Sequence, residues 1–166
     1  MPPDVASTDP AAGRTRPFLT TGCVLKPGEA PSDPRVIRRV GPVAVVAVHA
    51  MWESARGGHG FGASNDEVAA DYDAYLEAYA AKTGSPRDRR YLEAHEGHMI
   101  YLKPGEERFV QPEMIPVVTL TGDPGAVRER VQALAAAGVD NLTVQAIPGL
   151  APELIEEFGR EVIGRV

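Results

Sequence analysis

The stretch LTGDPGAVRERVQALAAAGVDNLTVQAIPG, residues 120–149, decides the fold class of this chain. Asp123 followed by Pro124 is typical of a helix start, because Asp caps free backbone amides and the fixed φ of proline suits the first helical position. Gly138 is typical of the helix end. The residues NLTVQAI, Asn141 to Ile147, then predict a buried strand.

The same alternation continues on both sides of this stretch. Met114 to Thr121 is rich in β-favouring residues, although Pro116 interrupts it. After Pro148 and Gly149, an apolar stripe predicts a last helix, formed by Leu154, Ile155, Phe158, Val162 and Ile163. Strands and helices that alternate with short connections indicate right-handed crossovers onto a parallel sheet. The sequence therefore predicts class α/β.

The upstream elements are a strand and two helices. Phe18 to Leu25 predicts a short buried strand. Asp33 to Ala55 predicts a helix bent near Pro42, although the run Val43 to Val48 also suits a strand. Ser64 to Lys82 predicts a capped helix with one apolar face, and Arg87 to Pro112 is irregular. Candidate strands are thus centred on Thr21, Met99 (a weak signal), Val118 and Val144.

Length and composition bound the domain organisation. Residues 1–16, rich in Pro, Ala, Asp and Ser, predict a disordered N-terminal tail. Residues 17–166 predict one domain or part of one, because the 166-residue chain is shorter than the roughly 250 residues of a complete (β/α)8 barrel. About four strands do not close such a barrel.

Charge and apolar content argue against a nucleic-acid-binding protein, a membrane-spanning protein and a secreted protein. A net charge of −6 opposes nucleic-acid binding, which needs a basic face. No apolar run is long enough for a membrane span or a signal peptide. Cys23 is the only cysteine, so no internal disulfide forms, and a cytoplasmic location is expected. Its apolar strand offers no neighbouring base, which favours a packed thiol over a nucleophile.

Histidines are the main candidates for chemistry. His49 and Glu53 are four residues apart on a predicted helix and are able to form an acid–base couple. His95 and His98 attract attention as titrating groups or ligands. Their spacing does not fit the zincin motif, so no metal site is expected and structural or substrate-contacting roles are favoured. A small metalloenzyme built on His95 and His98 is kept as a third alternative.

Other candidates lie near the carboxyl ends of the predicted strands. Thr121 and Gly122 precede a helix N-terminus, where phosphate binds unpaired amides, but capping by Asp123 is the favoured interpretation. Glu29 and Gln145 follow or end strands on the side where barrel enzymes place their sites. The glycine-rich loop Gly57 to Gly62 fits a mobile loop better than a dinucleotide fingerprint, because it follows a helix.

Three segments together resemble the luciferase-like flavin oxidoreductases, a class that includes methylenetetrahydromethanopterin reductase-like proteins. The strongest is Thr119 to Val166, which resembles the closing βαβα of the family. HEGHMIYLKPGEERFVQPEMI, His95 to Ile115, resembles the preceding segment, and GPVAVVAVHAMWE, Gly41 to Glu53, resembles an earlier helix.

The resemblance implies a (β/α)8 TIM barrel that uses FMN or a deazaflavin for hydride transfer or monooxygenation on a small-molecule substrate. It implies that this chain is the C-terminal half and lacks the N-terminal half. It points to His49, His95 and His98 as catalytic candidates and, near the cofactor, to Glu29, Thr121, Gly122 and Gln145. The alternative is a non-catalytic half-barrel that dimerises to cover its sheet edges. The expected partner is accordingly a second copy or the missing half.

Overall fold

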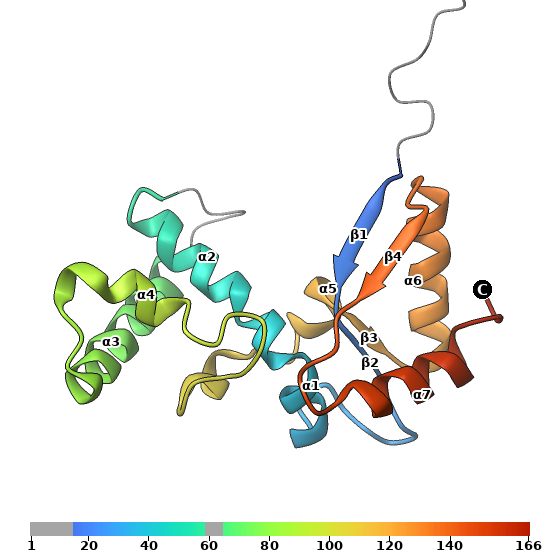
Figure 1. The fold of residues 1–166 in the computed structure, drawn as a ribbon, viewed down its shortest axis with the longest axis horizontal. Helices are drawn as coiled ribbons and strands as arrows, with labels where there is room; N and C mark the ends of the chain where they lie inside the picture. The colour runs from blue at the N-terminus through green and yellow to red at the C-terminus, as the bar shows by residue number, and fades with distance from the viewer. Residues whose placement is uncertain (1–14, 59–64) are drawn as a thin grey trace, which may run out of the picture.

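The computed structural model describes residues 15–58 and 65–166. The predicted tail lies outside these residues except for Thr15 and Arg16, and residues 59–62 of the glycine-rich loop also lie outside them. The described chain is an α/β structure with a strand part and a helical part side by side (Figure 1). The predicted α/β class is confirmed.

The strand part contains four short strands and four helices. The strands are β1 (Pro17–Thr20), β2 (Gly22–Val24), β3 (Leu120–Gly122) and β4 (Asn141–Val144). Two helices alternate with the last strands, α6 (Pro124–Ala136) and α7 (Ala151–Glu161). Two further helices, α1 (Pro34–Ala44) and α5 (Ile115–Val118), lie beside them (Figure 1).

The helical part is formed by the residues that lie between α1 and α5 in the chain. It consists of α2 (Val46–Ala55), α3 (Asp66–Thr83), α4 (Arg90–Ala94) and two 3-10 turns, η1 (Arg87–Arg89) and η2 (Glu106–Phe109). The predicted bend of the first helix is confirmed as the break between α1 and α2 at Val45, just after Pro42. The Asn65 side chain caps α3 by accepting a hydrogen bond from the amide of Val68.

The predicted strand at residues 18–25 is confirmed as β1 and β2, which belong to two separate two-stranded sheets and which we together call the central strand. β1 pairs in parallel with β4, and β2 pairs in parallel with β3. The Thr20 carbonyl accepts from the Gln145 amide, and the Thr21 carbonyl accepts from the Leu120 amide. Consecutive carbonyls of an extended chain point to opposite sides. Residues 17–24 therefore lie between β3 and β4.

Two strand predictions were wrong. Residues 115–118 of the predicted strand Met114 to Thr121 form the short helix α5, and only its last two residues belong to β3. Pro116 suits the first turn of a helix, and the Thr119 hydroxyl donates back to the Ile115 carbonyl at 2.6 Å, which stabilises that turn. The weak strand at Met99 is a series of turns instead. No closed barrel is formed within the part of the chain that the structure describes.

Two apolar clusters hold the described elements together, and the first of them spans both parts. One joins α1, α2 and α3 around Val40, Val48, Tyr72 and Leu76. The other packs α6 and α7 on the sheet through Val127, Leu154 and Phe158. None of the described helices combines the length and the apolar character needed to cross a membrane.

Buried ion pairs join α1 to α7. The Arg39 side chain is almost fully buried and pairs with Glu157 and, at 2.7 Å, with Glu153. Arg35 pairs with Glu157 at 2.6 Å and also with Glu29. Because each charge has a partner, the pairs fix the position of α7 against the first helix without leaving an isolated buried charge.

Gly22 is required by the close approach of the strands and α7. A Cβ built at Gly22 lies 2.5 Å from the Leu120 carbonyl oxygen and 2.6 Å from the Phe158 ring. We expect Gly22→Ala to lower the free energy of unfolding by about 3 kcal/mol or more, because a backbone strand has to move. Gly159→Ala is the matched control, since its Cβ meets nothing within 4 Å and alanine favours a helix by about 1 kcal/mol. Urea unfolding measures both, and equal stability of the two variants would contradict this packing.

Candidate functional site

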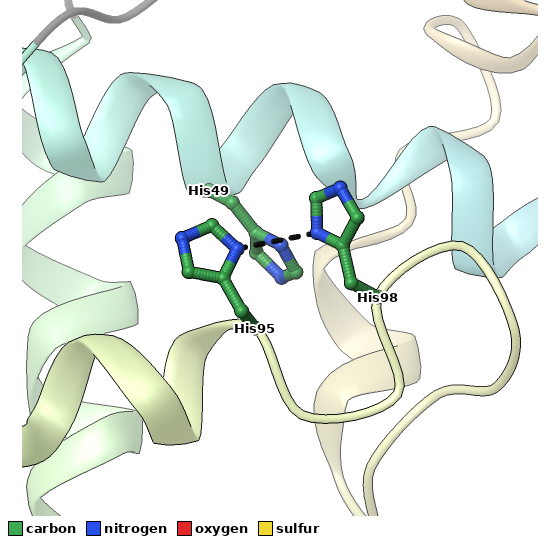
Figure 2. A group of neighbouring side chains, drawn as sticks. All are labelled: His49, His95 and His98. Atoms are coloured by element: carbon green, nitrogen blue, oxygen red, sulfur yellow. Dashed lines mark hydrogen bonds between the residues drawn. The ribbon is translucent and has the colours of Figure 1, made fainter.

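Three histidines from distant parts of the sequence converge in the helical part (Figure 2). His49 comes from α2, His95 directly follows α4, and His98 lies in the turn after it. The Nδ1 atoms of His95 and His98 are 3.3 Å apart. The His49 ring centroid lies 6.0 Å from that of His95 and 5.7 Å from that of His98. The three catalytic candidates thus form one cluster, which we call the histidine cluster.

The carboxylates of the histidine cluster are paired differently from the expected His49 and Glu53 couple. Glu53 accepts a hydrogen bond from Nε2 of His95 at 2.7 Å. His49 uses its own Nε2 to contact Glu106 at 3.1 Å. The predicted His49 and Glu53 couple is therefore wrong, because each of the two residues bonds to a residue that follows α3 in the chain.

Glu106 is the buried acid of the site, and it is 1% exposed. Its Oε1 accepts hydrogen bonds from His49, from the Tyr72 hydroxyl at 2.7 Å and from Lys103 Nζ at 2.7 Å. Its Oε2 accepts from the Lys103 amide at 3.0 Å. Burial raises the pKa of Glu106, but the hydrogen bonds from His49, Lys103 and Tyr72 outweigh burial and lower it to about 2. Glu106 is therefore ionised at neutral pH.

Lys103 connects this acid to the end of α4. Its Nζ, which is fully buried, donates to the Ala94 carbonyl at 3.1 Å and to the Tyr72 hydroxyl at 3.3 Å. His95 is the next residue after Ala94, so the buried pair fixes the backbone that presents His95. Sequence reasoning missed Glu106, Lys103 and Tyr72, because the first two lie in a Pro-Gly turn typical of a surface and Tyr72 was assigned to an apolar helix face.

Two residues in the left-handed region shape the turn that carries His98. Gly97 has φ +72°, and a Cβ there lies 2.7 Å from the Tyr101 ring. Met99 has φ +60°, which is unusual for a residue with a side chain. The Gln145 side chain donates to the Met99 carbonyl at 3.0 Å. Gln145 therefore holds the His98 turn in place from the end of β4.

Burial changes the pKa of two histidines and one tyrosine of the site. Burial lowers the pKa of His49 below its ordinary value, and the hydrogen bond to Glu106 offsets this only in part. Burial and the neighbouring histidines lower the pKa of His98. Burial raises the pKa of Tyr72, so its hydroxyl remains a donor. The cluster offers nitrogen lone pairs that are able to accept a proton or bind an electron-poor centre.

The expected cofactor contacts do not join the histidine cluster as a group. Glu29 lies in a surface hollow of about 330 Å³ at the carboxyl ends of β2 and β3, which we call the strand-end hollow; it is lined by Leu25, Lys26, Pro27, Gly28, Glu29, Asp123 and Pro124. Thr121 is buried and its hydroxyl is bonded to that of Thr119 at 2.7 Å. The Gly122 carbonyl accepts from the Leu25 amide. Of the four, Gln145 alone contacts the turn that carries His98.

Two interpretations at the strand ends are confirmed. The Asp123 carboxylate accepts hydrogen bonds from the Gly125 and Ala126 amides at 2.8 and 3.0 Å, so it caps α6 as expected. Cys23 is fully buried, and burial raises the pKa of its thiol to about 11. Because the thiolate is the nucleophile, this cysteine is a packed core residue.

The buried Glu106 charge is expected to be indispensable to the helical part. Glu106→Gln leaves the buried Lys103 ammonium without its anion, so we expect unfolding free energy to fall by about 3–5 kcal/mol. Glu107→Gln is the matched control, because Glu107 is the exposed neighbour and surface changes stay within about 0.5 kcal/mol. Urea unfolding at pH 7 compares the two. A loss below 1 kcal/mol in Glu106→Gln would show that the pair is not buried as described.

Compared with known protein families, curated proteins and solved structures, the chain has no match.

Proposed function

We propose that this chain is part of a flavin- or deazaflavin-dependent oxidoreductase of the bacterial luciferase-like class, acting on a small-molecule substrate by hydride transfer or monooxygenation. The observation that carries the proposal is the β3-α6-β4-α7 unit, residues 120–161. It is the segment with the strongest resemblance to the closing βαβα of that class, and its strands are parallel to the central strand as a (β/α) unit requires.

In this proposal the chain contributes the C-terminal half of a (β/α)8 barrel. Successive strands of such a barrel are neighbours, whereas residues 17–24 separate β3 from β4 here. The proposal therefore includes a change of strand pairing. Either β1 separates from β4 or β2 separates from β3 when further polypeptide supplies the remaining strands. The unpaired outer edges of β3 and β4 are the positions where added strands bind.

The strand-end hollow is the proposed contact for the anionic end of the cofactor. Enzymes with parallel (β/α) units bind ligands at the carboxyl ends of their strands, which is where this hollow lies. Lys26 is the cation that lines it, next to Glu29. The Glu29 carboxylate is already bonded to Arg35, whose hydrogen bond lowers the pKa of Glu29 to about 2. Lys26 therefore remains available to pair with a phosphate.

Titration of the chain with FMN, and separately with a deazaflavin, tests the proposal. We expect saturable changes in the absorption spectrum and quenching of fluorescence. Lys26→Glu is expected to weaken binding at least ten-fold, because it places an acid beside the phosphate. Lys82→Glu, an exposed lysine at the end of α3, is the control and should bind like the unmodified chain. No spectral change with either cofactor contradicts the proposed contact.

A second candidate function is a non-catalytic interaction protein that pairs with its own copy. An apolar groove of about 440 Å³ lies beside β4 and α7; Val131, Leu142, Val144, Phe158, Ile163 and Val166 are among its lining residues. Ile163 is 71% exposed. Exposed apolar surface next to an unpaired strand edge favours association between copies.

Light scattering after size exclusion tests this second candidate. We expect the unmodified chain to elute as a dimer and Ile163→Glu as a monomer, because the acid would be desolvated in the interface. Val117→Glu is the control, since Val117 is similarly exposed at 68% but lies on α5. A monomeric unmodified chain at high concentration rules out pairing between copies.

A further inference from the structure

The histidine cluster contains a buried polar atom that no described group satisfies. His49 is 2% exposed, and its Nδ1 is buried without a hydrogen-bond partner among the described residues. Leaving such an atom unpaired costs about 1–3 kcal/mol. Buried imidazole nitrogens are normally bonded, so the environment of this nitrogen points to a missing ligand.

The neighbouring carboxylates determine which nitrogens carry protons. An ionised carboxylate only accepts hydrogen bonds, so the ring nitrogen facing it carries the hydrogen. Glu106 faces Nε2 of His49, and Glu53 faces Nε2 of His95. In the neutral form of each ring, which is the form that binds a metal, Nδ1 is then the bare nitrogen. Two lone pairs are thereby directed away from the carboxylates, one of them in the buried His49 ring.

A hydrogen bond between His95 and His98 accounts for only part of this arrangement. If His98 donates from Nδ1, it satisfies the bare Nδ1 of His95 across the 3.3 Å contact. The Nδ1 of His49 is still without a hydrogen-bond partner among the residues that the structure describes. A single cation between the rings satisfies all three histidines.

The spacing of the nitrogens suits a metal ion. Each ring offers one nitrogen such that all three lie within 4.8 Å of one another. Zinc–nitrogen bonds of about 2.0–2.1 Å place two ligands of a tetrahedral site about 3.3 Å apart. The separation of the His95 and His98 Nδ1 atoms has this value. Only the distance to the buried His49 ring has to shorten when the metal binds.

The surroundings resemble the supporting shell of a metal site. Metal-bound histidines usually donate their second ring nitrogen to a carboxylate, which fixes the ring and strengthens the ligand. Glu53 and Glu106 have this position relative to His95 and His49. Lys103 balances the Glu106 charge, so Glu53 remains to offset part of a dication. His98 is partly exposed and opens a path to solvent.

We propose that His49, His95 and His98 bind a divalent transition-metal ion, with Zn²⁺ as the best match. Imidazole ligands favour zinc and its neighbours over Mg²⁺ and Ca²⁺, which prefer oxygen. Three protein ligands leave a fourth position for water or a substrate oxygen. The sequence motif did not reveal this site, because the third ligand is His49, which lies on α2 46 residues before His95. Metal binding at these three histidines does not require a flavin.

Metal titration of the full chain, stripped with a chelator, tests the site. We expect calorimetry to show one Zn²⁺ per chain, and Co²⁺ to give the visible bands of a site with low coordination number. His98→Ala is expected to weaken binding at least 100-fold. Glu53→Gln keeps all three ligands and is expected to weaken binding 10- to 100-fold through its loss of support for His95.

His59→Ala is the control, because His59 is the fourth histidine of the chain and lies outside the described residues. It should bind Zn²⁺ like the unmodified chain. Circular dichroism of each variant identifies one that fails to fold, and the partly exposed His98 makes His98→Ala the decisive change. The proposal is overturned if the unmodified chain binds no Zn²⁺ in a 1:1 ratio, if His98→Ala binds equally well, or if His59→Ala loses binding to the same extent.

Discussion

A buried carboxylate at Glu106 is the constraint on which the helical part depends. A charge removed from water is stable only when donors surround it. Here the donors are His49 from α2, Tyr72 from α3 and Lys103 from the segment after α4. Satisfying one anion therefore fixes three elements against one another. Apolar packing around Tyr72 holds the elements together, whereas the carboxylate sets their relative orientation.

The same requirement explains why the histidines lie close together. Lys103 reaches past Glu106 to the Ala94 carbonyl, and this contact places the next residue, His95, opposite α2. Glu53, one turn after His49 on α2, then accepts from His95. The positions of two histidines are thus set by two acids, one buried and one partly exposed. A third imidazole, His98, enters from a turn whose backbone adopts the left-handed conformation at Gly97 and Met99.

Local sequence signals predicted the elements whose formation depends on neighbours in the chain. The cap at Asp123, the break after Pro42 and the central strand all follow from short-range chemistry. The helix after Met114 was not predicted from these signals. A β-favouring run that contains a proline also fits a helical turn once the Thr119 hydroxyl bonds back to the Ile115 carbonyl. The pairing of residues 17–24 with both later strands was also hidden, since strand order depends on contacts across more than 90 residues.

The site was predictable in its residue types but not in its partners. Helical spacing related His49 to Glu53, yet the carboxylate that bonds His49 lies 57 residues away in the chain. Nothing in the turn Lys103 to Glu106 marks these charges as buried, because Lys, Pro, Gly and Glu are typical of surfaces. Burial of a paired charge is a property of the tertiary structure. Short-range reasoning therefore finds the histidines, and only the fold shows that Glu106, Lys103 and Tyr72 meet them.

Gln145 links the two parts of the molecule by contacting both the central strand and the turn that carries His98. Its backbone amide bonds to Thr20 of the central strand, while its side chain holds the Met99 carbonyl. Met99 is in a costly backbone conformation, which persists only when surrounding contacts maintain it. The Gln145 side chain is one of these contacts, and it fixes the turn carrying His98 relative to the end of β4. The strand part therefore supports the turn that carries His98 through the Gln145 side chain.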